Sequence, residues 1–394
     1  MWNTRSQAPN KNGKARQDPR TLKLAFRNLF HDRIRLAVTL VGILFSIVLI
    51  AVQLGLYMGA RNMIIAMIER ADGDLWVMAY GTKNFEEAQP IGARARYAAL
   101  STPGVIKAVP LVTSFADWRK PTGGSTLVVV IGSDPEEQTL TPWNVVEGSL
   151  SELGARDAVV VDKTYLHELG IEGIGSTAQI GASRVRVVAL TEGLRSFTVS
   201  PYVFTTLNRA RALLDMAGDT TTYVLVKLAP DADVEAVRSE IASKLPDDEV
   251  LTRTNFLERS LNHWLFATGA GVALIGGAIL GLVVGTVIVA QTLYSSTKDH
   301  LNEFATLRAL GSSSGYIHKV ILAQAAISAV IGYILGMGIA LLIVALSENT
   351  ALPIVMTPGL AALLLMLTVG MCSISAISAI AKVMKIDPAM VFNR

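Results

Sequence analysis

The sequence has few charged residues and almost no cysteine. Charged side chains make up 17% of the 394 residues, against roughly a quarter in an ordinary soluble domain. Its one cysteine, Cys372, can form neither an internal disulfide nor a cysteine cluster around a metal. These shortages argue against a purely soluble protein, a disulfide-stabilised scaffold and a cysteine metal site. The low charge agrees with the high apolar content, because apolar residues are 51% of the chain and are concentrated in four blocks.

The sequence also lacks two features of energy-coupled proteins. It contains no Gly-x-x-x-x-Gly-Lys-Ser/Thr loop, so this chain cannot bind ATP phosphates in that way. Asp, Glu, Lys, Arg and His do not occur in the cores of the four apolar blocks, where ion and proton pathways generally place them. A Gly-x-Ser-x-Gly string at 311–315 follows an expected helix, whereas a nucleophile elbow needs a strand. We therefore predict a non-catalytic chain that is not proton-coupled.

Each apolar block is long enough to cross a bilayer, which takes about 20 residues. Residues 1–35 hold nine basic and two acidic residues, a net charge of +7, and such an excess stays in the cytoplasm. The expected segments are a cytoplasmic basic segment (1–35), a first span (36–60), an external domain (61–264), a second span (265–291), a cytoplasmic loop (292–319), a third span (320–346), a short external loop (347–357), a fourth span (358–381) and a cytoplasmic tail (382–394). Both termini are thus predicted to be cytoplasmic.

The external segment is long enough to bury a core of its own. Residues 61–265 contain 20 basic and 26 acidic residues, a net charge of −6. Extended runs at 105–112 and 125–131 flank a Gly-Gly turn, which predicts a hairpin, and 233–245 has the pattern of an amphipathic helix. We predict a mixed α+β domain of two subdomains. Helical stalks should join it to the membrane, one continuing the first span and one opening at a capping box of Asn255 and Glu258.

Two short amphipathic helices are expected on the cytoplasmic side. The first carries Leu22, Phe26, Leu29 and Phe30 on one face among basic residues, a pattern typical of a helix in the membrane interface; a solvated basic helix is the alternative. The second spans 302–310 and ends at a glycine. Its apolar residues need lipid or a partner to cover them.

The second span contains a row of glycines at a spacing of four residues. The row consists of Gly277, Gly281 and Gly285. Small residues at this spacing allow close approach of helices. We expect close packing or dimerisation here, with a substrate groove as the alternative.

The string from Glu303 to Gly311, followed by a polar stretch and a span, resembles the loop between the second and third helices of MacB- and FtsX-type ABC permeases. The sequence at 386–392 is similar to that family's closing signature, and the order of one span, a large external domain and three spans matches throughout. Gln53-Leu54-Gly55-Leu56 and the basic entry helix resemble DevC-type permeases.

The resemblance implies functions for the two cytoplasmic helices. The residues of the coupling helix, which docks on a separate ATPase chain that holds the ATP, would be Glu303, Phe304, Leu307, Arg308, Leu310 and Gly311. The helix with Leu22, Phe26, Leu29 and Phe30 would be its interfacial companion. This sequence departs from the macrolide exporter of the family because no nucleotide-binding domain is fused to it.

On this basis we expect a permease subunit in the inner membrane, with no cofactor of its own and no nucleic-acid partner. It would form a homodimer, packed through Gly277, Gly281 and Gly285, with ATPase chains. It would drive export of a hydrophobic or lipid-like substrate, and the DevC resemblance implies a periplasmic adaptor and an outer-membrane duct. The alternatives are an FtsX-like signal transmitter that activates cell-wall hydrolases and a lipoprotein-releasing permease.

Overall fold

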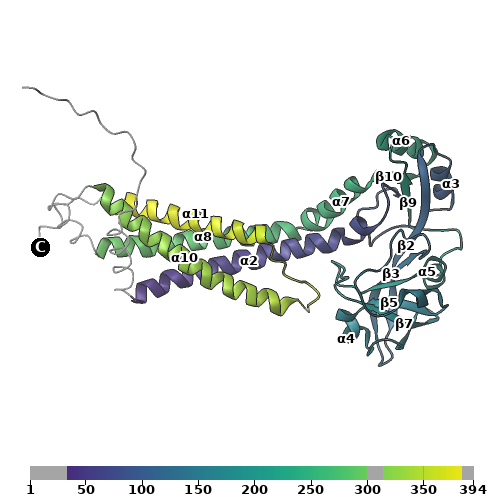
Figure 1. Ribbon diagram of the computed structural model, residues 1–394, viewed down its shortest axis with the longest axis horizontal. Helices are drawn as coiled ribbons and strands as arrows, with labels where there is room; N and C mark the ends of the chain where they lie inside the picture. The colour runs from purple at the N-terminus through teal and green to yellow at the C-terminus, as the bar shows by residue number, and fades with distance from the viewer. Residues whose placement is uncertain (1–32, 300–313, 349, 384–394) are drawn as a thin grey trace, which may run out of the picture. The chain divides into compact units, whose positions relative to one another are not determined.

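The computed structural model describes residues 33–299, 314–348 and 350–383 (Figure 1). These residues form two compact units. The first contains the described residues within Met1–Gln53, Gly277–Leu342 and Met356–Arg394, and the second contains Leu54–Gly276 and those within Ile343–Val355. Helix α2 (Arg33–Arg70) runs without interruption from the first unit into the second.

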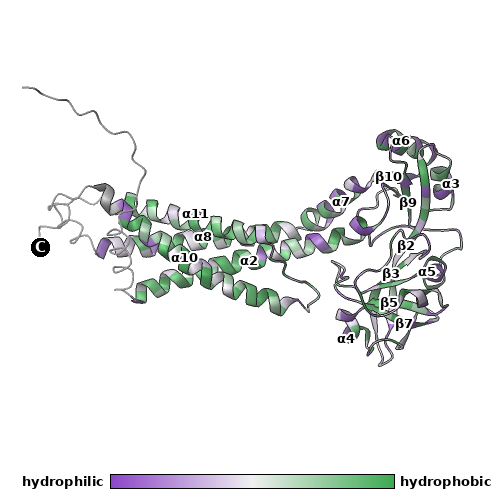
Figure 2. Cartoon of the chain, viewed as in Figure 1, coloured by the Kyte–Doolittle hydropathy of each residue, from purple (hydrophilic) through white to green (hydrophobic). Residues whose placement is uncertain are grey.

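Four long apolar helices correspond to the predicted spans. They are α2, α8 (Ala270–Asp299), α10 (Ser314–Ser347) and α11 (Pro358–Val383). Each contains a stretch with a mean hydropathy of 2.3 or more, long enough to cross a membrane, and Figure 2 shows hydrophobic residues along all of them. At 1.5 Å per residue, even 26 residues reach about 39 Å, beyond the ~30 Å of a bilayer core. The continuation of α2 to Arg70 agrees with the predicted helical stalk, whereas α8 begins only at Ala270, five residues after the predicted start of the second span.

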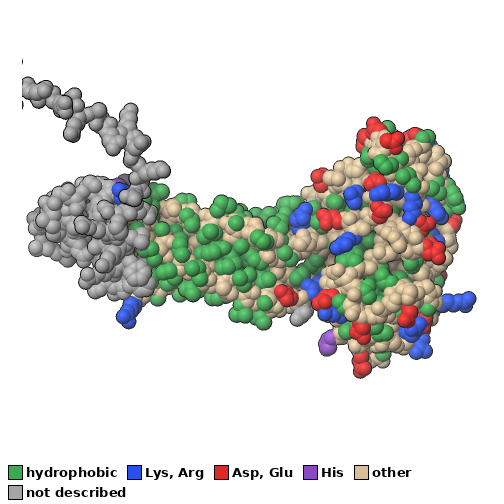
Figure 3. All heavy atoms as spheres, in the orientation of Figure 1, with side chains coloured by type: hydrophobic (Ala, Val, Ile, Leu, Met, Phe, Trp, Pro, Cys, Tyr) green, Lys and Arg blue, Asp and Glu red, His purple; other side chains and the backbone are tan. Residues whose placement is uncertain are grey.

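Small side chains and hydrogen bonds between helices hold the first unit together. Ser375 Oγ of α11 donates to Thr286 O of α8, and Tyr333 OH of α10 donates to Ala361 O of α11, each at 2.9 Å. The buried core contains Ile43, Ile47, Val289, Leu293, Ile321, Ala325, Ala329, Met371, Cys372, Ala376 and Ala379. Outside this core, large apolar side chains cover the visible face of the helices (Figure 3). Such a surface is suited to lipid.

The second unit contains two lobes built on one shared strand, β2 (Val105–Arg119). In the first lobe, β1 (Leu75–Ala79) lies between β10 (Asp248–Thr252) and β9 (Tyr223–Leu228), and β9 pairs with the first half of β2, all antiparallel. Helices α3 (Arg94–Leu100) and α6 (Val234–Lys244) share a buried core with these strands.

The second lobe is a closed barrel. The second half of β2 pairs with β3, and the pairing continues through β8, β5 and β7 to β6, which returns to β2 at Trp118 and Arg119. The strands are β3 (Ser125–Ser133), β4 (Val145–Gly148), β5 (Ala158–Asp162), β6 (Thr177–Ile180), β7 (Ser183–Thr191) and β8 (Tyr202–Thr206). Closure leaves no free edge in the ring, and β4 alone extends it by pairing with β7. Alternate residues such as Val128, Val130 and Val187 fill the interior.

Short helical segments complete the second unit. They are η1 (Leu150–Gly154), η2 (Lys163–Tyr165), α4 (Leu166–Leu169), α5 (Leu207–Leu213), α7 (Arg253–Leu261) and the π-helix η3 (Asn262–Ala267). The mixed α+β class and the two lobes agree with the prediction. The predicted hairpin is the β2–β3 turn, where Gly123 and Gly124 have φ of +99° and +82°, a conformation that favours glycine.

Candidate functional site

Two groups of predicted site residues lie outside the described part of the chain. They are the coupling residues Glu303, Phe304, Leu307, Arg308, Leu310 and Gly311, and the interfacial residues Leu22, Phe26, Leu29 and Phe30. Their functions stay predictions. The described residues show instead how α8 and α10, the helices on either side of residues 300–313, pack on α2.

The glycine row of α8 faces α2 of the same chain. A Cβ added at Gly277 would lie 2.7 Å from Gln53 Nε2, and one at Gly281 would lie 3.2 Å from Leu49 and Ile50 side-chain atoms. At Gly285 an added Cβ would overlap Ser46 Oγ and lie 2.6 Å from Met371 Sδ. The row therefore packs closely against α2 of the same chain, which is the close helix packing that the sequence analysis expected. Its use in a homodimer interface stays a prediction.

Two glycines of α10, Gly332 and Gly336, also pack closely against α2. A Cβ added at Gly336 would lie 3.0 Å from Ile47 Cβ, and one at Gly332 would overlap Ile43. Ser46 Oγ lies between these isoleucines in sequence and donates to Gly42 O at 3.0 Å. Side chains of α2 thus interlock with glycine surfaces on both α8 and α10, so α2 cannot slide along either helix without overlap.

Three segments of the second unit pack on its part of α2, residues 54–70, and we name the four together the collar. The three are 193–200, 253–267 and 347–355. The loop 347–355 lies directly on the backbone of α2, because Val355 N donates to Gly55 O at 3.1 Å and a Cβ added at Gly59 would overlap Pro353 O.

Aromatic side chains and an arginine join the collar segments. Phe197 and Trp264 have ring centroids 5.2 Å apart, and both pack on the buried residues Ile64 and Leu265. Arg195 Nη2 donates to Glu348 O at 2.5 Å. The collar therefore fixes the short external loop and a barrel loop on α2.

The second connection to the membrane is not a continuous helix. Helix α7 begins at the cap Thr252, whose Oγ1 accepts from Asn255 N at 3.2 Å; the predicted capping box starting at Asn255 is wrong. The helix passes into the π-helix η3, which ends at Ala267, and Gly269 follows with a φ of +81°. Single-turn π-segments are frequent at functional sites. Both connections are helical as predicted, but only α2 is continuous, because residues 268 and 269 separate η3 from α8.

An ion pair ties α7 to the first lobe. Arg259 Nη1 and Nη2 donate to the two carboxylate oxygens of Glu249 on β10, each at 2.6 Å. The pair is bidentate, a geometry that restricts rotation, and Arg259 lowers the pKa of the Glu249 carboxyl below its usual value. Displacement of α7 is thus passed to the sheet of the first lobe.

A buried carboxyl group anchors the segment that follows β1. Glu86 is 5% exposed and accepts hydrogen bonds from Tyr202 OH at 2.6 Å and Thr198 Oγ1 at 2.8 Å. Desolvation raises the pKa of the Glu86 carboxyl above its usual value, against the effect of these hydrogen bonds. Tyr223 OH donates to the neighbouring Asn84 O at 3.0 Å. Sequence reasoning missed Glu86, because one acidic residue in a polar stretch has no distinguishing pattern.

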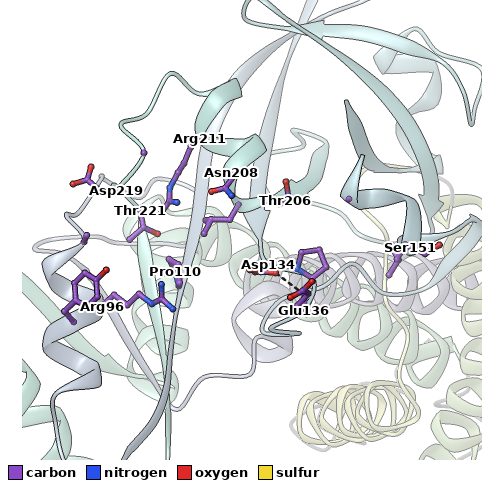
Figure 4. A pocket seen from close by; sticks show the side chains of 17 residues that line it. Arg96, Pro110, Asp134, Glu136, Ser151, Thr206, Asn208, Arg211, Asp219 and Thr221 are labelled. Atoms are coloured by element: carbon purple, nitrogen blue, oxygen red, sulfur yellow. Dashed lines mark hydrogen bonds between the residues drawn. The ribbon is translucent and has the colours of Figure 1, made fainter. Parts of the chain in front are cut away.

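A hollow of about 750 Å³ lies between the two lobes (Figure 4). Arg96 and Arg211 contribute to its lining, together with Asp134 and Glu136. Both arginines are engaged with backbone, since Arg96 Nε donates to Ala108 O at 3.1 Å and Arg211 Nε donates to Thr220 O at 2.7 Å. The mixed charges select no single class of ligand. Within the described residues, no group of three His, Cys, Asp or Glu side chains is placed to bind a metal.

Two known families match this sequence. The MacB-like periplasmic core domain matches residues 36–244, and the FtsX-like permease C-terminal domain matches residues 275–388. An uncharacterized ABC transporter permease of Mycobacterium tuberculosis is 24% identical over 372 residues, which cover 92% of this chain and 95% of that protein.

Two further relatives carry the MacB name. The macrolide export ATP-binding/permease protein MacB of Escherichia coli is 20% identical over 338 residues, which cover 81% of this chain and 51% of that protein. The chain thus spans about half the length of this relative. The crystal structure of the periplasmic region of MacB from Actinobacillus actinomycetemcomitans aligns with a TM-score of 0.37 and 10% identity, covering 50% of this chain and 96% of that one. From the two family matches, this multi-pass membrane protein belongs to the MacB/FtsX-type ABC transporter permeases.

Proposed function

We propose that this chain is the membrane subunit of an ABC exporter and transmits the motion of an ATPase to its external domain. The observation that carries the proposal is the uninterrupted helix α2, which interlocks with α8 and α10 in the first unit and with the collar loop in the second. A continuous helix is a direct covalent path for a displacement from one unit to the other. The substrate would be hydrophobic or lipid-like, as the family resemblance implies.

The proposed path of motion starts at the cytoplasmic loop. An ATPase chain would push the predicted helix at 302–310, which lies in sequence between the end of α8 and the start of α10. The side chains of Ser46 and Ile47 on α2 lie directly against Gly285 of α8 and Gly336 of α10. Displacement of either helix would therefore displace α2. The collar then passes the displacement to the lobes.

The proposed assembly contains partners besides this chain. We propose that an ATPase chain binds the ATP, as in the ABC transporter permease family to which this chain belongs. We further propose a homodimer in the inner membrane with both termini in the cytoplasm, supported by the basic residues at 1–35. A periplasmic adaptor and an outer-membrane duct would complete the export path.

Recruitment of the ATPase tests this proposal. Replacing Phe304 and Leu307 together by Ala should reduce capture of the ATPase by the solubilised chain more than tenfold, because truncation of a buried interface anchor costs about 1–3 kcal/mol and tenfold corresponds to about 1.4 kcal/mol. The matched control replaces the flanking Glu303 and Arg308 by Gln, which should change binding only slightly because rim charges contribute little affinity. Equal capture and equal ATP hydrolysis by all three proteins would refute the coupling assignment.

The two alternatives share this transmission path and differ in what the external domain contacts. Photo-crosslinking from Leu127, which is 48% exposed on β3, would distinguish them in cells. An adaptor with a long coiled coil supports export, a cell-wall hydrolase supports the FtsX-like function, and a lipoprotein carrier supports lipoprotein release.

A further inference from the structure

The collar contains a hollow of about 280 Å³ whose lining changes from apolar to cationic. Met63, Pro353 and Val355 contribute an apolar floor, and Arg70, Arg195 and Glu69 contribute charged groups. The hollow lies entirely within the second unit. Such a gradient suits a ligand that has an ionic head and an apolar body.

Arg195 and Arg70 have N–H groups for which no hydrogen bond is found among the described residues. Arg195 uses Nη2 for Glu348 O, but its Nε is buried and has no hydrogen-bond partner among the described residues. An unmatched buried donor is costly. The guanidinium of Arg70 lies over the ring of Trp143 at 5.2 Å, and neither arginine forms an ion pair within the described residues. The hollow is therefore lined by two guanidinium groups whose charge no carboxylate pairs with among the described residues, and an anion would supply that pairing.

The position of the apolar floor along the chain places the hollow at the external surface of the membrane that the helices span. Gly59 lines the hollow one residue before the end of the charge-free run 36–60. Arg195 contacts Glu348, the first residue after α10. The polar layer of a bilayer leaflet is about 5–8 Å thick, and α2 rises about 16 Å from Gly59 to Arg70. Arg195 thus lies near headgroup level, and Arg70 lies above it.

We propose that this hollow binds the phosphodiester headgroup of an amphiphile at the external surface of the membrane that the helices span. The phosphate oxygens would accept charge-assisted hydrogen bonds from Arg195 and Arg70, a pairing that guanidinium groups favour. The first carbons of the chains would lie on Met63, Pro353 and Val355. Glu69 at the rim disfavours a doubly charged phosphate monoester, and for this reason we specify a diester. The proposal holds for export, lipoprotein release or signalling, because binding needs no ATPase.

Titration of the full chain in neutral detergent tests the proposal. Short-chain phosphatidylglycerol is added, and retained lipid is counted by native mass spectrometry. Arg195→Gln should weaken binding at least tenfold, and Arg70→Gln should also weaken it. The matched control is Arg61→Gln, which removes the same charge from an exposed position of α2 outside the hollow and should leave the affinity unchanged. A diacylglycerol with the same chains should not bind at this site.

The outcomes separate the possible sources of binding. Equal weakening by Arg61→Gln and Arg195→Gln would show attraction to general surface charge and overturn the proposal. Binding by Arg195→Gln and Arg70→Gln that matches the unmodified chain would also overturn it. Displacement of the lipid by inorganic phosphate at similar concentration would identify a site for free phosphate instead of an amphiphile. If Arg195→Gln does not fold, Arg70→Gln on the exposed side of α2 decides alone.

Discussion

Replacing Gly285 by Ala should loosen the helix bundle, whereas the same change at Gly276 should not. A Cβ at position 285 would lie 2.7 Å from Ser46 Cβ and 2.6 Å from Met371 Sδ, but one at Gly276 meets nothing within 4 Å. The methionine end can move aside. Ser46 Cβ is attached directly to the backbone of α2, so the two helices must separate.

These contacts allow the magnitude to be estimated for each variant. Overpacking of a well-packed interior costs about 1–3 kcal/mol, and Ala stabilises a helix by roughly 0.5–1 kcal/mol relative to Gly. Gly285→Ala should therefore lower the stability of the bundle by about 1–2 kcal/mol, which is a factor of about 5–30 in the opening equilibrium. Gly276→Ala has only the favourable contribution, so opening should be unchanged or roughly 2–5 times rarer.

The single cysteine provides the assay. Cys372 is 1% exposed and lies in the same core as Met371, so a maleimide reaches the thiol only when the bundle opens. When closing is fast, the labelling rate follows the opening equilibrium. Labelling of Gly285→Ala should thus be about 5–30 times faster than that of the unmodified chain in the same detergent.

A double variant separates overlap from other effects. Ser46→Gly removes both atoms of that side chain, so its combination with Gly285→Ala should label more slowly than the two single changes predict together. Equal labelling rates for Gly285→Ala and Gly276→Ala, or strict additivity in the double variant, would refute the interlocking of α2 and α8.

Two further predictions concern topology and pH. In a Cys372→Ser background, cysteine at Ser125 should react with an impermeant reagent in intact cells, and cysteine at Ser313 only after permeabilisation; labelling at Ser313 in intact cells contradicts the orientation. The raised pKa of the buried Glu86 carboxyl means that the folded state binds this proton more tightly than the unfolded state. Its contribution to stability is therefore fully present below the ordinary pKa of about 4.5 and falls as pH rises through the folded value. We therefore compare the melting temperatures of Glu86→Gln and the unmodified chain by tryptophan fluorescence. The melting temperature of the variant minus that of the unmodified chain should increase as the pH is raised from about 4.5, and a constant difference would contradict the reasoning.

The spans and the hairpin could be predicted because their signals are local. An uncharged apolar run of more than 20 residues is typical of a membrane helix, and Gly123-Gly124 between two extended runs indicates a turn wherever it occurs. Strand β1 gave no such signal. Trp76 and Met78 enter one core and Leu75 and Val77 the other, so the strand is apolar on both faces and shows no alternation.

The functional contacts depended on tertiary structure. The spacing of Gly277, Gly281 and Gly285 predicted a close approach, but the same spacing serves a helix of the same chain or of a second copy. Arg195 and Glu86 are single polar residues in loops. Their environments, an unmatched buried donor and a desolvated carboxyl group, arise only when distant segments meet.

The shared strand β2 makes the external domain one cooperative folding unit despite its two lobes. Residues Val105–Leu111 complete the sheet of the first lobe through β9, and Val112–Arg119 complete the barrel through β3 and β6. Loss of either ladder therefore exposes backbone hydrogen-bonding groups of the other lobe, which is costly. Neither lobe can unfold while its neighbour stays intact, so amide protons of β9 and β3 should exchange with solvent at the same limiting rate, set by a single global opening of the domain.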